Sequence, residues 1–343
     1  MTLTTTTTPG DTTQPVSPGR AAARRRRRRI RPGGRAAYAY VAPFFIVFAA
    51  FSLYPWINTA WVSLHDVRLT TYNKQKWVGF ANYHNLFTND FFWNAFKNTI
   101  TIGIISTVPQ LCMALGIAHL LNYRLRGRTF FRISLLMPYA TSLAAATVIF
   151  VQLFNKDTGF INWFLHGIFR LPLIDWQNNK WASQIAVSSI VTWRWTGYNA
   201  LIYLAAMQTI DNTLYEAAAI DGASRWKQFL HVTIPGIRPT IIFTIIVSTI
   251  GATQLFGEPL LYEPQGLPIG GTGRQYQTLG LLMYEQGWTN DRLGLASATA
   301  WTMFVIIVIA VLINLWLARR REKWTGSRNV IPVTAIERQE AAT

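Results

Sequence analysis

Six long stretches of the sequence are almost free of charged residues, and they constrain the fold more than any other feature. A helix needs about 20 apolar residues to cross the hydrocarbon core of a bilayer, and each stretch comes close to that length or exceeds it. Only Arg194 interrupts one of them. The sequence therefore predicts an all-α polytopic membrane protein with six transmembrane helices. The stretches cover residues 36–64, 98–123, 133–155, 181–210, 239–257 and 293–318.

The composition argues against a soluble domain. Half of the 343 residues are hydrophobic and 14% are charged, whereas soluble domains carry about 25% charged residues. The net charge of +17 does not indicate a nucleic-acid partner, because Lys and Arg concentrate at the chain ends and in short segments between the apolar stretches. Such a distribution encodes orientation in a membrane.

The basic residues predict that both termini are cytoplasmic. With the N-terminus inside, 22 Lys and Arg residues fall in cytoplasmic segments and nine in outer segments. Because basic loops are retained on the cytoplasmic side, we expect a multi-pass protein of the plasma (inner) membrane with an N-in/C-in topology. The membrane domain of this topology covers residues 36–321.

The two tails are expected to lie in the cytoplasm. Residues 1–35 are rich in Thr and then polybasic, with an unbroken Arg run at 24–29. This composition cannot bury a core and predicts a disordered tail whose Arg run contacts anionic membrane lipid. It does not fit a cleavable signal peptide, because the following apolar stretch is too long. Residues 322–343 form the C-terminal tail.

Motifs for catalysis and for metal binding are absent from the sequence. No phosphate-binding loop of the G-x-x-x-x-G-K-[ST] type occurs, and no pair of histidines has zinc-ligand spacing. The glycines at 270, 271 and 273 are interpreted as a flexible outer loop. We therefore expect no catalytic residue, no metal and no cofactor bound by this chain.

The polar segment 211–239 has an unusual pattern for a loop between the fourth and fifth apolar stretches. Thr213 and Glu216 have the spacing of a capping box, which predicts that a short helix starts there. Gly222 offers the left-handed conformation that ends helices. A second short helix is expected over residues 224–233, with Pro235 and Pro239 ending it.

Helices this short need a surface to dock on. Isolated helices below about 12 to 15 residues are marginal in water. From periodicity alone, the membrane surface and a groove on a partner protein remain equally good candidates for that surface.

A resemblance to a known family comes from this same segment. Glu216-Ala217-Ala218, three residues, Gly222, nine residues and then Val232-Thr233-Ile234-Pro235 closely resemble the E-A-A-x3-G-x9-I-x-L-P signature of ABC importer permeases. Val232 and Ile234 are conservative departures from it. The string from Tyr215 to Ala223 is similar to the carbohydrate branch, with its MalF-type and UgpA-type subunits. Residues 77–83 resemble the F-V-G-x-x-N-Y stretch common after the first span.

The resemblance implies a transmembrane permease subunit of an ATP-driven, binding-protein-dependent sugar importer, not an enzyme. It implies that a sister permease (MalG-type) completes the translocation path, that two ATPase subunits carry ATP and Mg, and that an extracytoplasmic solute-binding protein delivers the substrate. The short helix of the loop would couple to the ATPase. The implied ATPase-coupling residues are Tyr215, Glu216, Ala217, Ala218, Asp221, Gly222 and Pro235.

The resemblance also implies a substrate path along the two spans that flank this loop. Its candidate residues are Trp193, Arg194, Thr196, Gly197, Asn199, Thr249, Thr253 and Gln254. Thr and Gly in a membrane helix more often serve helix packing, and an intramembrane Arg is functional, paired or snorkels to the interface. A disaccharide or short oligosaccharide is the favoured substrate, with glycerol-3-phosphate as an alternative.

Two other classes of protein remain open from the sequence. A channel or secondary transporter would work without an ATPase, so that copurification of an ATPase separates it from an importer. A membrane-embedded enzyme would need a convergent set of titratable residues within the spans, and loss of activity on mutation of a single acid would indicate it.

Overall fold

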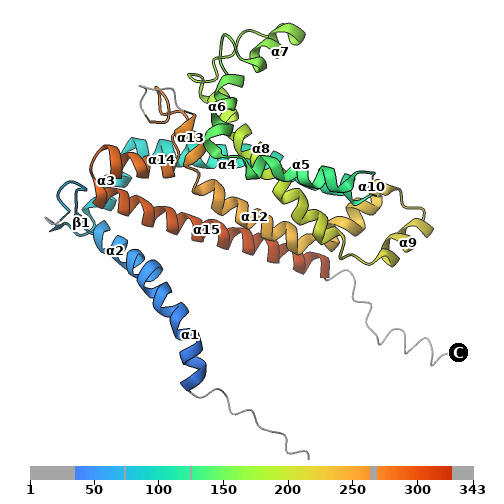
Figure 1. The fold of residues 1–343 in the computed structure, drawn as a ribbon, viewed down its shortest axis with the longest axis horizontal. Helices are drawn as coiled ribbons and strands as arrows, with labels where there is room; N and C mark the ends of the chain where they lie inside the picture. Colours follow the sequence, from blue (N-terminus) through green and yellow to red (C-terminus); the bar gives the residue numbers. More distant parts are fainter. Residues whose placement is uncertain (1–34, 73–74, 124–125, 263–268, 327–343) are drawn as a thin grey trace, which may run out of the picture. The chain divides into compact units, whose positions relative to one another are not determined.

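The structure, a computed structural model, describes residues 35–72, 75–123, 126–262 and 269–326. Most of the predicted N-terminal tail and residues 327–343 of the C-terminal tail lie outside the described residues. The chain divides into two units, residues 1–55 and 56–343, and each is considered by itself. The described residues are mostly helical (Figure 1), which confirms the predicted class.

The first unit contains the beginning of a long apolar helical run. Its elements are α1 (Arg35–Phe48) and the π-helical turn η1 (Ala49–Leu53), and α2 (Tyr54–Ser63) continues from it into the second unit. The apolar side chains of α1 are largely exposed, as expected of a helix that faces lipid or another membrane subunit.

The second unit holds the remaining elements. The longer helices are α4 (Asp90–Asn122), α5 (Arg128–Ala140), α6 (Leu143–Leu153), α7 (Phe160–Phe169), α8 (Lys180–Met207), α12 (Arg238–Thr253) and α15 (Leu293–Gly326). The shorter ones are α3 (Ala81–Phe87), α9 (Asn212–Ile220), α10 (Arg225–Gln228), η2 (Phe229–Thr233), α11 (Ile234–Gly236), α13 (Gly257–Leu261), α14 (Leu279–Tyr284) and η3 (Glu285–Thr289). Strands β1 (His65–Asp66) and β2 (Lys76–Trp77) pair antiparallel and place His65 opposite Trp77.

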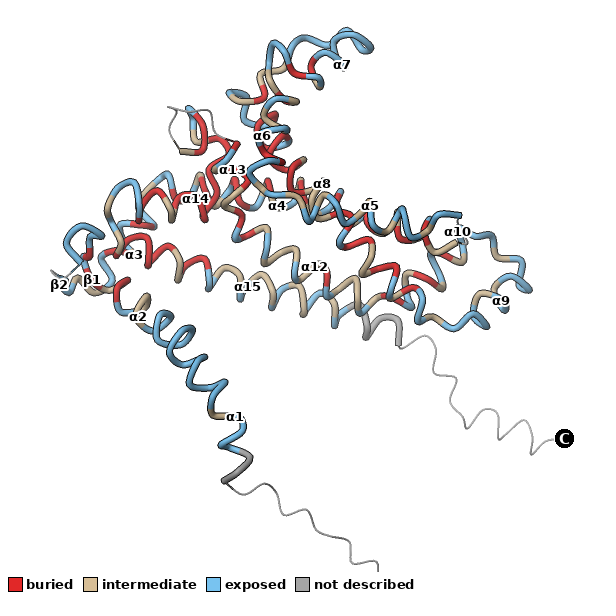
Figure 2. The backbone as a smooth tube through the Cα atoms, in the orientation of Figure 1, coloured by how far each residue is buried: buried red, intermediate tan, exposed pale blue. Residues whose placement is uncertain are grey.

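Helices α4 and α8 form the centre of the second unit. They make the most extensive contact between two elements; α12 packs on α4, α5 packs on α8, and α15 runs beside α12 (Figure 1). Buried residues concentrate along α8 and α14, whereas α5 buries none (Figure 2). Exposed apolar residues such as Val305, Ile309 and Leu312 cover α15. The inside is therefore partly polar and the outside apolar, as a lipid environment favours.

Among the residues that the structure describes, three helical segments are long and apolar enough to cross a membrane: Tyr38–Ser63, Asp90–Asn122 and Leu293–Arg320. Two bent pairs, α5 with α6 and Arg225–Gly236 with α12, raise this number to five if each pair is one span. Helix α8 has 28 residues but is less apolar, because it carries many buried polar side chains.

The third apolar stretch is not one straight helix, which corrects the sequence prediction for residues 133–155. It breaks between α5 and α6 with a bend of 90°. Thr141, with φ −69° and ψ 141°, is extended and ends α5, and a new helix starts after Ser142. An extended residue cannot continue the hydrogen bonds of a helix, so the helix ends here. The prediction used only the spacing of charged residues, which does not depend on backbone conformation and therefore did not reveal this break.

The stretch at 77–83 forms a clamp, by which we mean a set of hydrogen bonds that fixes the C-terminal end of α2. Asn82 is buried, and its Nδ2 donates to the carbonyls of Ser63 at 2.9 Å and His65 at 3.0 Å. The Tyr83 hydroxyl lies 2.9 Å from Ser63 Oγ. Gly79 adopts φ +57°, which suits a glycine at the turn before α3. These bonds tie the end of α2 to β1 and α3.

We expect Asn82→Ala to lower the free energy of unfolding by about 1–3 kcal/mol, because two buried carbonyls lose their donor. Thermal unfolding in detergent measures this loss. Asn85→Ala on the exposed side of α3 is the matched control and should change the free energy by less than about 0.5 kcal/mol. Equal effects of the two variants would contradict the clamp.

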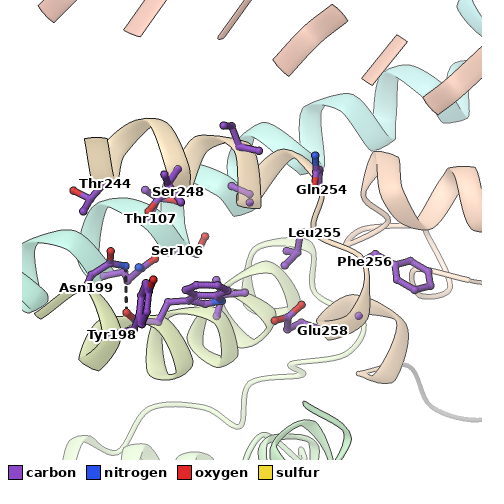
Figure 3. A pocket seen from close by; sticks show the side chains of 18 of the residues that line it. Ser106, Thr107, Tyr198, Asn199, Thr244, Ser248, Gln254, Leu255, Phe256 and Glu258 are labelled. Carbon is purple, nitrogen blue, oxygen red and sulfur yellow. Dashed lines mark hydrogen bonds between the residues drawn. The ribbon is translucent and has the colours of Figure 1, made fainter. Parts of the chain in front are cut away.

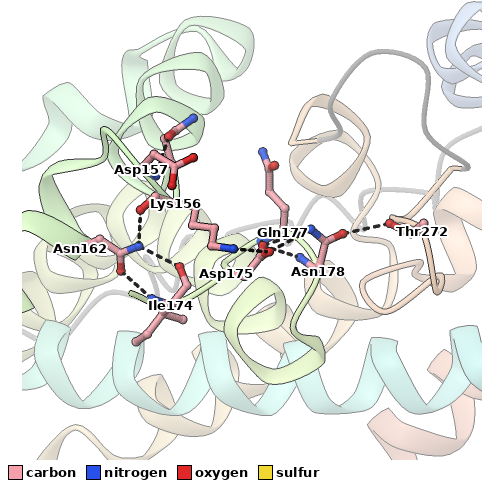
Figure 4. A network of polar contacts seen from close by, with 9 residues as sticks. Lys156, Asp157, Asn162, Ile174, Asp175, Gln177, Asn178 and Thr272 are labelled. Carbon is pink, nitrogen blue, oxygen red and sulfur yellow. Dashed lines mark hydrogen bonds and ion pairs between the residues drawn. The ribbon is translucent and has the colours of Figure 1, made fainter. Parts of the chain in front are cut away.

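A polar network orders the segment between α6 and α8 (Figure 4). Asn162 on α7 donates from Nδ2 to the carbonyls of Lys156 and Ile174, both at 2.8 Å. Asp175 accepts from Asn178 and pairs with Lys156 Nζ at 3.6 Å. Burial opposes ionisation of Asp175, but the hydrogen bonds from Asn178 and the Lys156 charge outweigh it and lower its pKa.

The glycine-rich segment is a packed turn and not the flexible loop expected from the sequence. Gly270 and Gly271 have φ near +90° and are buried. A Cβ on Gly270 would lie 2.4 Å from that of Gln277. The glycines are needed for this conformation and close contact.

Candidate functional site

The first helix of the loop between α8 and α12 starts earlier than the sequence predicted. Helix α9 begins at Asn212, and the Asp211 carboxylate caps it by accepting from the Thr213 backbone N–H at 2.9 Å. Thr213 lies inside the helix, so the predicted Thr213–Glu216 capping box is wrong. An Asp at the N-terminus satisfies the same free N–H groups and also interacts with the helix dipole. The bond from Thr213 lowers the pKa of Asp211.

The end of α9 agrees with the sequence prediction. Gly222 adopts φ +75°, and its backbone N–H donates to the Ala219 carbonyl at 3.0 Å. The N–H of Ala223 donates to the Ala218 carbonyl at 2.9 Å. This pair of bonds is a Schellman motif, in which a glycine takes the left-handed position. Gly222 therefore ends α9 and turns the chain toward α10.

The second helix does not stop at Pro235, which is a further correction. Ser224 caps α10, and the helical run continues through η2 and α11 to Gly236. It breaks at Ile237 with a bend of 70° into α12. Pro239 stands in the first turn of α12, where a missing N–H costs nothing, whereas Pro235 lies within the continuous run from α10 to α11.

Contacts with α4 anchor this loop to the bundle. The Phe229 ring, which is buried, lies 4.3 Å from the His119 ring. The Arg225 guanidinium lies over the Tyr123 ring at 5.2 Å. The loop is thus fixed on the end of α4 through the residues after Gly222.

Helix α9 itself stays exposed. It buries no residue completely; Leu214 is 54% exposed and Ile220 is 87% exposed. Of the predicted coupling residues, Glu216, Ala217, Asp221, Gly222 and Pro235 are exposed, whereas Tyr215 and Ala218 are half-buried.

Tyr215 has a contact inside the chain. Its hydroxyl lies 2.9 Å from Thr233 Oγ1 of η2. It therefore holds α9 against the following helical run, and the exposed residues leave a free surface of α9 for another molecule.

A second site is a cavity of about 580 Å³ between α4, α8, α12 and α13. Its size falls within the range of about 300–1,000 Å³ typical of small-molecule pockets. Side chains of α8 face those of α4 and α12 across it (Figure 3). Its polar and aromatic lining residues include Ser106, Thr107, Gln110, Trp195, Tyr198, Asn199, Thr244, Ser248, Gln254, Phe256 and Glu258.

Two of the predicted path residues, Asn199 and Gln254, line this cavity. Arg194 lies beside it, because its Nη1 pairs with Glu258 Oε1 at 3.0 Å. The side chains of Arg194 and Glu258 are 15% and 8% exposed, so that the pair is almost buried. Of the interpretations open from the sequence, the structure favours pairing of Arg194 over snorkelling.

The other predicted path residues have packing contacts and do not line the cavity. Thr196 and Thr253 are buried and donate to carbonyls one helical turn earlier. Thr249 does the same and accepts from Asn314 at 3.4 Å. The Trp193 ring packs 5.6 Å from that of Phe150.

Gly197 allows α8 to approach α5 closely. A Cβ at this position would lie 1.8 Å from the Leu135 carbonyl oxygen. It therefore serves helix packing, the alternative that the sequence left open.

We expect Gly197→Ala to destabilise the protein by about 1–3 kcal/mol or more, since the backbone of α5 must move. Gly116→Ala on α4, where an added Cβ meets nothing within 4 Å, is the matched control. It should be neutral or stabilising by up to about 1 kcal/mol. Unfolding of both variants in detergent tests this, and equal stability of the two would contradict the close contact.

Comparison with known proteins decides the family. A family model described as the binding-protein-dependent transport system inner membrane component matches residues 100–323, which contain the cavity-lining helices and the exposed α9. The chain belongs to this family.

Individual relatives agree with this assignment. The permease is 33% identical to the lactose transport system permease protein LacF of Rhizobium radiobacter, over 83% of this chain and 94% of that protein. It is 34% identical to the sn-glycerol-3-phosphate transport system permease protein UgpA of Escherichia coli, over 80% and 91%. A solved bacterial ABC transporter involved in the import of the acidic polysaccharide alginate matches with a TM-score of 0.70, 25% identity and coverage of 83% and 95%.

The resemblance read from the E-A-A segment is thereby confirmed. The permease is the membrane subunit of an ABC importer and not an enzyme, since ATP hydrolysis belongs to a separate subunit in these systems. Importers of this family work with a solute-binding protein, and the chain is their inner membrane component.

Sequence reasoning missed most residues of the cavity wall. Ser106, Thr107 and Gln110 belong to α4, which was not considered part of the path. Polar residues spaced three or four apart in an otherwise apolar stretch were the available signal. Trp195 and Tyr198 were next to predicted residues, but their direction on α8 was unknown.

Proposed function

We propose that this permease is one of two membrane subunits of an ATP-driven sugar importer, and that its cavity forms part of the translocation path. The observation that carries the proposal is the combination of a polar and aromatic cavity with an exposed α9 bearing the E-A-A residues. Neutral hydrogen-bonding groups and aromatic faces are what a sugar ring needs. A disaccharide or short oligosaccharide suits the volume of the cavity.

The proposal includes six spans with both termini in the cytoplasm. The five candidate spans together with α8 make six, and the distribution of Lys and Arg supports the orientation. Residues 36–321 would then be the membrane domain, flanked by cytoplasmic tails.

Coupling to the ATPase is assigned to α9. Exposed apolar residues on a nine-residue helix support a groove on a partner as its docking surface. Glu216 supplies the charged contact, Ala217 and Ala218 the close approach, and Gly222 the turn. ATP and Mg would bind to the two ATPase subunits, whose closure would move α9 and shift the permease between inward-open and outward-open states.

Purification of the permease from its native membrane in mild detergent tests this function. We expect an ATPase and a second permease to copurify, and ATP hydrolysis to rise when sugar and the solute-binding protein are added. Recovery of the chain alone, with uptake that survives depletion of ATP, would contradict the importer assignment.

A further inference from the structure

The charge of the transported molecule is left open by family membership. One relative is named for lactose, which is uncharged, another for sn-glycerol-3-phosphate, and a matching structure for an acidic polysaccharide. The following argument rests on the proposed function and uses the wall of the cavity to choose between these classes.

Formal charge in the cavity wall is confined to one place. Among the described residues that line the cavity, Glu258 is the only acid or base. Its Oε1 lies 3.0 Å from Arg194 Nη1, and both side chains are mostly buried. Arg194 is not itself a lining residue. The ligand therefore contacts the Glu258 carboxylate, and the Arg194 guanidinium that compensates its charge lies on the side away from the cavity.

An anion would be disfavoured in this cavity. Transfer of a charge out of water is costly unless an opposite charge compensates it. The nearby cation, Arg194, is already paired with Glu258. Glu258 lines the cavity and Arg194 does not, so an incoming phosphate or carboxylate would lie nearer the carboxylate than the cation, and repulsion would outweigh attraction in surroundings of low dielectric constant.

The remaining polar groups suit an uncharged saccharide. Gln110, Asn199, Ser248 and Gln254 present amides and hydroxyls from three helices and the turn after α12, and such neutral groups can bond to sugar hydroxyls. Trp195 contributes an aromatic ring to the same wall. Neutral donors, acceptors and an aromatic face recognise a sugar without requiring a charge on it.

We propose that the cavity admits uncharged saccharides and excludes anionic ones, with Glu258 as the specificity-determining residue and Arg194 as the residue that positions its carboxylate. Removal of Glu258 alone would leave the Arg194 cation beside the cavity and reverse the preference. Removal of Arg194 alone would leave a net negative wall.

Reactivity of an introduced cysteine measures the charge preference without knowledge of the substrate. The chain has one cysteine, Cys112, so Cys112→Ser gives a background in which Ser248→Cys places a single thiol in the cavity wall. Thr158→Cys, in the exposed segment after α6, is the control position. The complex, purified with its copurifying subunits, is treated with hydroxyethyl methanethiosulfonate (neutral) or sulfonatoethyl methanethiosulfonate (anionic).

We expect the ratio of the anionic to the neutral reaction rate to be about tenfold lower at position 248 than at position 158. Glu258→Gln should raise the ratio at position 248 by at least about tenfold, and Arg194→Gln should lower it further. If the pair had only a structural role, the two variants would change the rates of the anionic and the neutral reagent by the same factor and leave the ratio unchanged. The ratio in the background with the native pair is informative even if these variants fail to fold.

An equal or higher ratio at position 248 than at position 158 would overturn the proposal and assign an anionic ligand. Protection of the cysteine is the second arm, with lactose and maltose as neutral probes and sn-glycerol-3-phosphate and glucuronate as anionic ones. Protection by anionic probes alone would also overturn the proposal. If no probe protects while the ratio is low, lactose and maltose are excluded as ligands and the charge preference stands.

Discussion

ATP-driven uptake should be lost in the Glu216→Lys variant, while the chain stays folded and inserted in the membrane. Glu216 is exposed on α9, where it carries no packing of the bundle. At the proposed contact, removal of one charge of a buried pair costs about 2–5 kcal/mol, and a reversal adds repulsion. Uptake should therefore fall by at least about 30-fold.

Uptake of labelled sugar and recovery of the ATPase with the tagged permease measure this effect. Lys227→Glu reverses an exposed charge on the neighbouring α10 and is the matched control, because Lys227 occupies one of the nine unspecified positions between Gly222 and Val232. We expect that control to transport normally. Normal uptake by Glu216→Lys with an intact complex would show that the coupling role of α9 is wrong.

The second large effect is expected from Arg194→Ala, which should destabilise the permease by about 3–5 kcal/mol. The variant leaves the Glu258 carboxylate nearly buried without its partner, and an uncompensated buried charge accounts for losses of this size. Thermal or denaturant-induced unfolding in detergent measures the change in the free energy of unfolding.

Two comparisons separate loss of charge compensation from loss of packing. The double variant Arg194→Met/Glu258→Gln should recover most of the stability, because it removes both charges and keeps similar volume. Lys156→Ala breaks a pair at 3.6 Å whose side chains are 51% and 31% exposed, and it should cost less than about 1 kcal/mol. A loss for Arg194→Ala as small as that for Lys156→Ala would contradict the argument.

The helices could be located from the sequence because apolar length is a local property. The stretch at 98–123 corresponds to α4, although α4 starts at Asp90. Asn89 caps it by accepting from the Phe91 N–H, and the helix then includes Asp90 and Lys97, charged residues that a search for uncharged stretches excludes. The 90° break between α5 and α6 was not visible, because Thr141 and Ser142 are compatible with a helix or an extended segment.

The turn after α9 could also be predicted, since a Schellman motif depends on a glycine and its immediate neighbours. The start of α9 was less certain for a similar reason. Asp211 and Thr213 are both good caps two residues apart, and the sequence does not say which one has the extended conformation that a cap requires. The structure places Asp211 there.

The sequence by itself determined the helical membrane class, the family and the place of the E-A-A loop between two apolar stretches, because these depend on apolar length, on charge distribution and on a motif contained in 20 consecutive residues. Only the tertiary structure decided the cavity. Arg194 and Glu258 are 64 residues apart, and Gly197 contacts α5 through Leu135. Whether a polar residue of a span faces a cavity or a neighbouring helix depends on the rotation and packing of helices distant in sequence, which periodicity cannot specify.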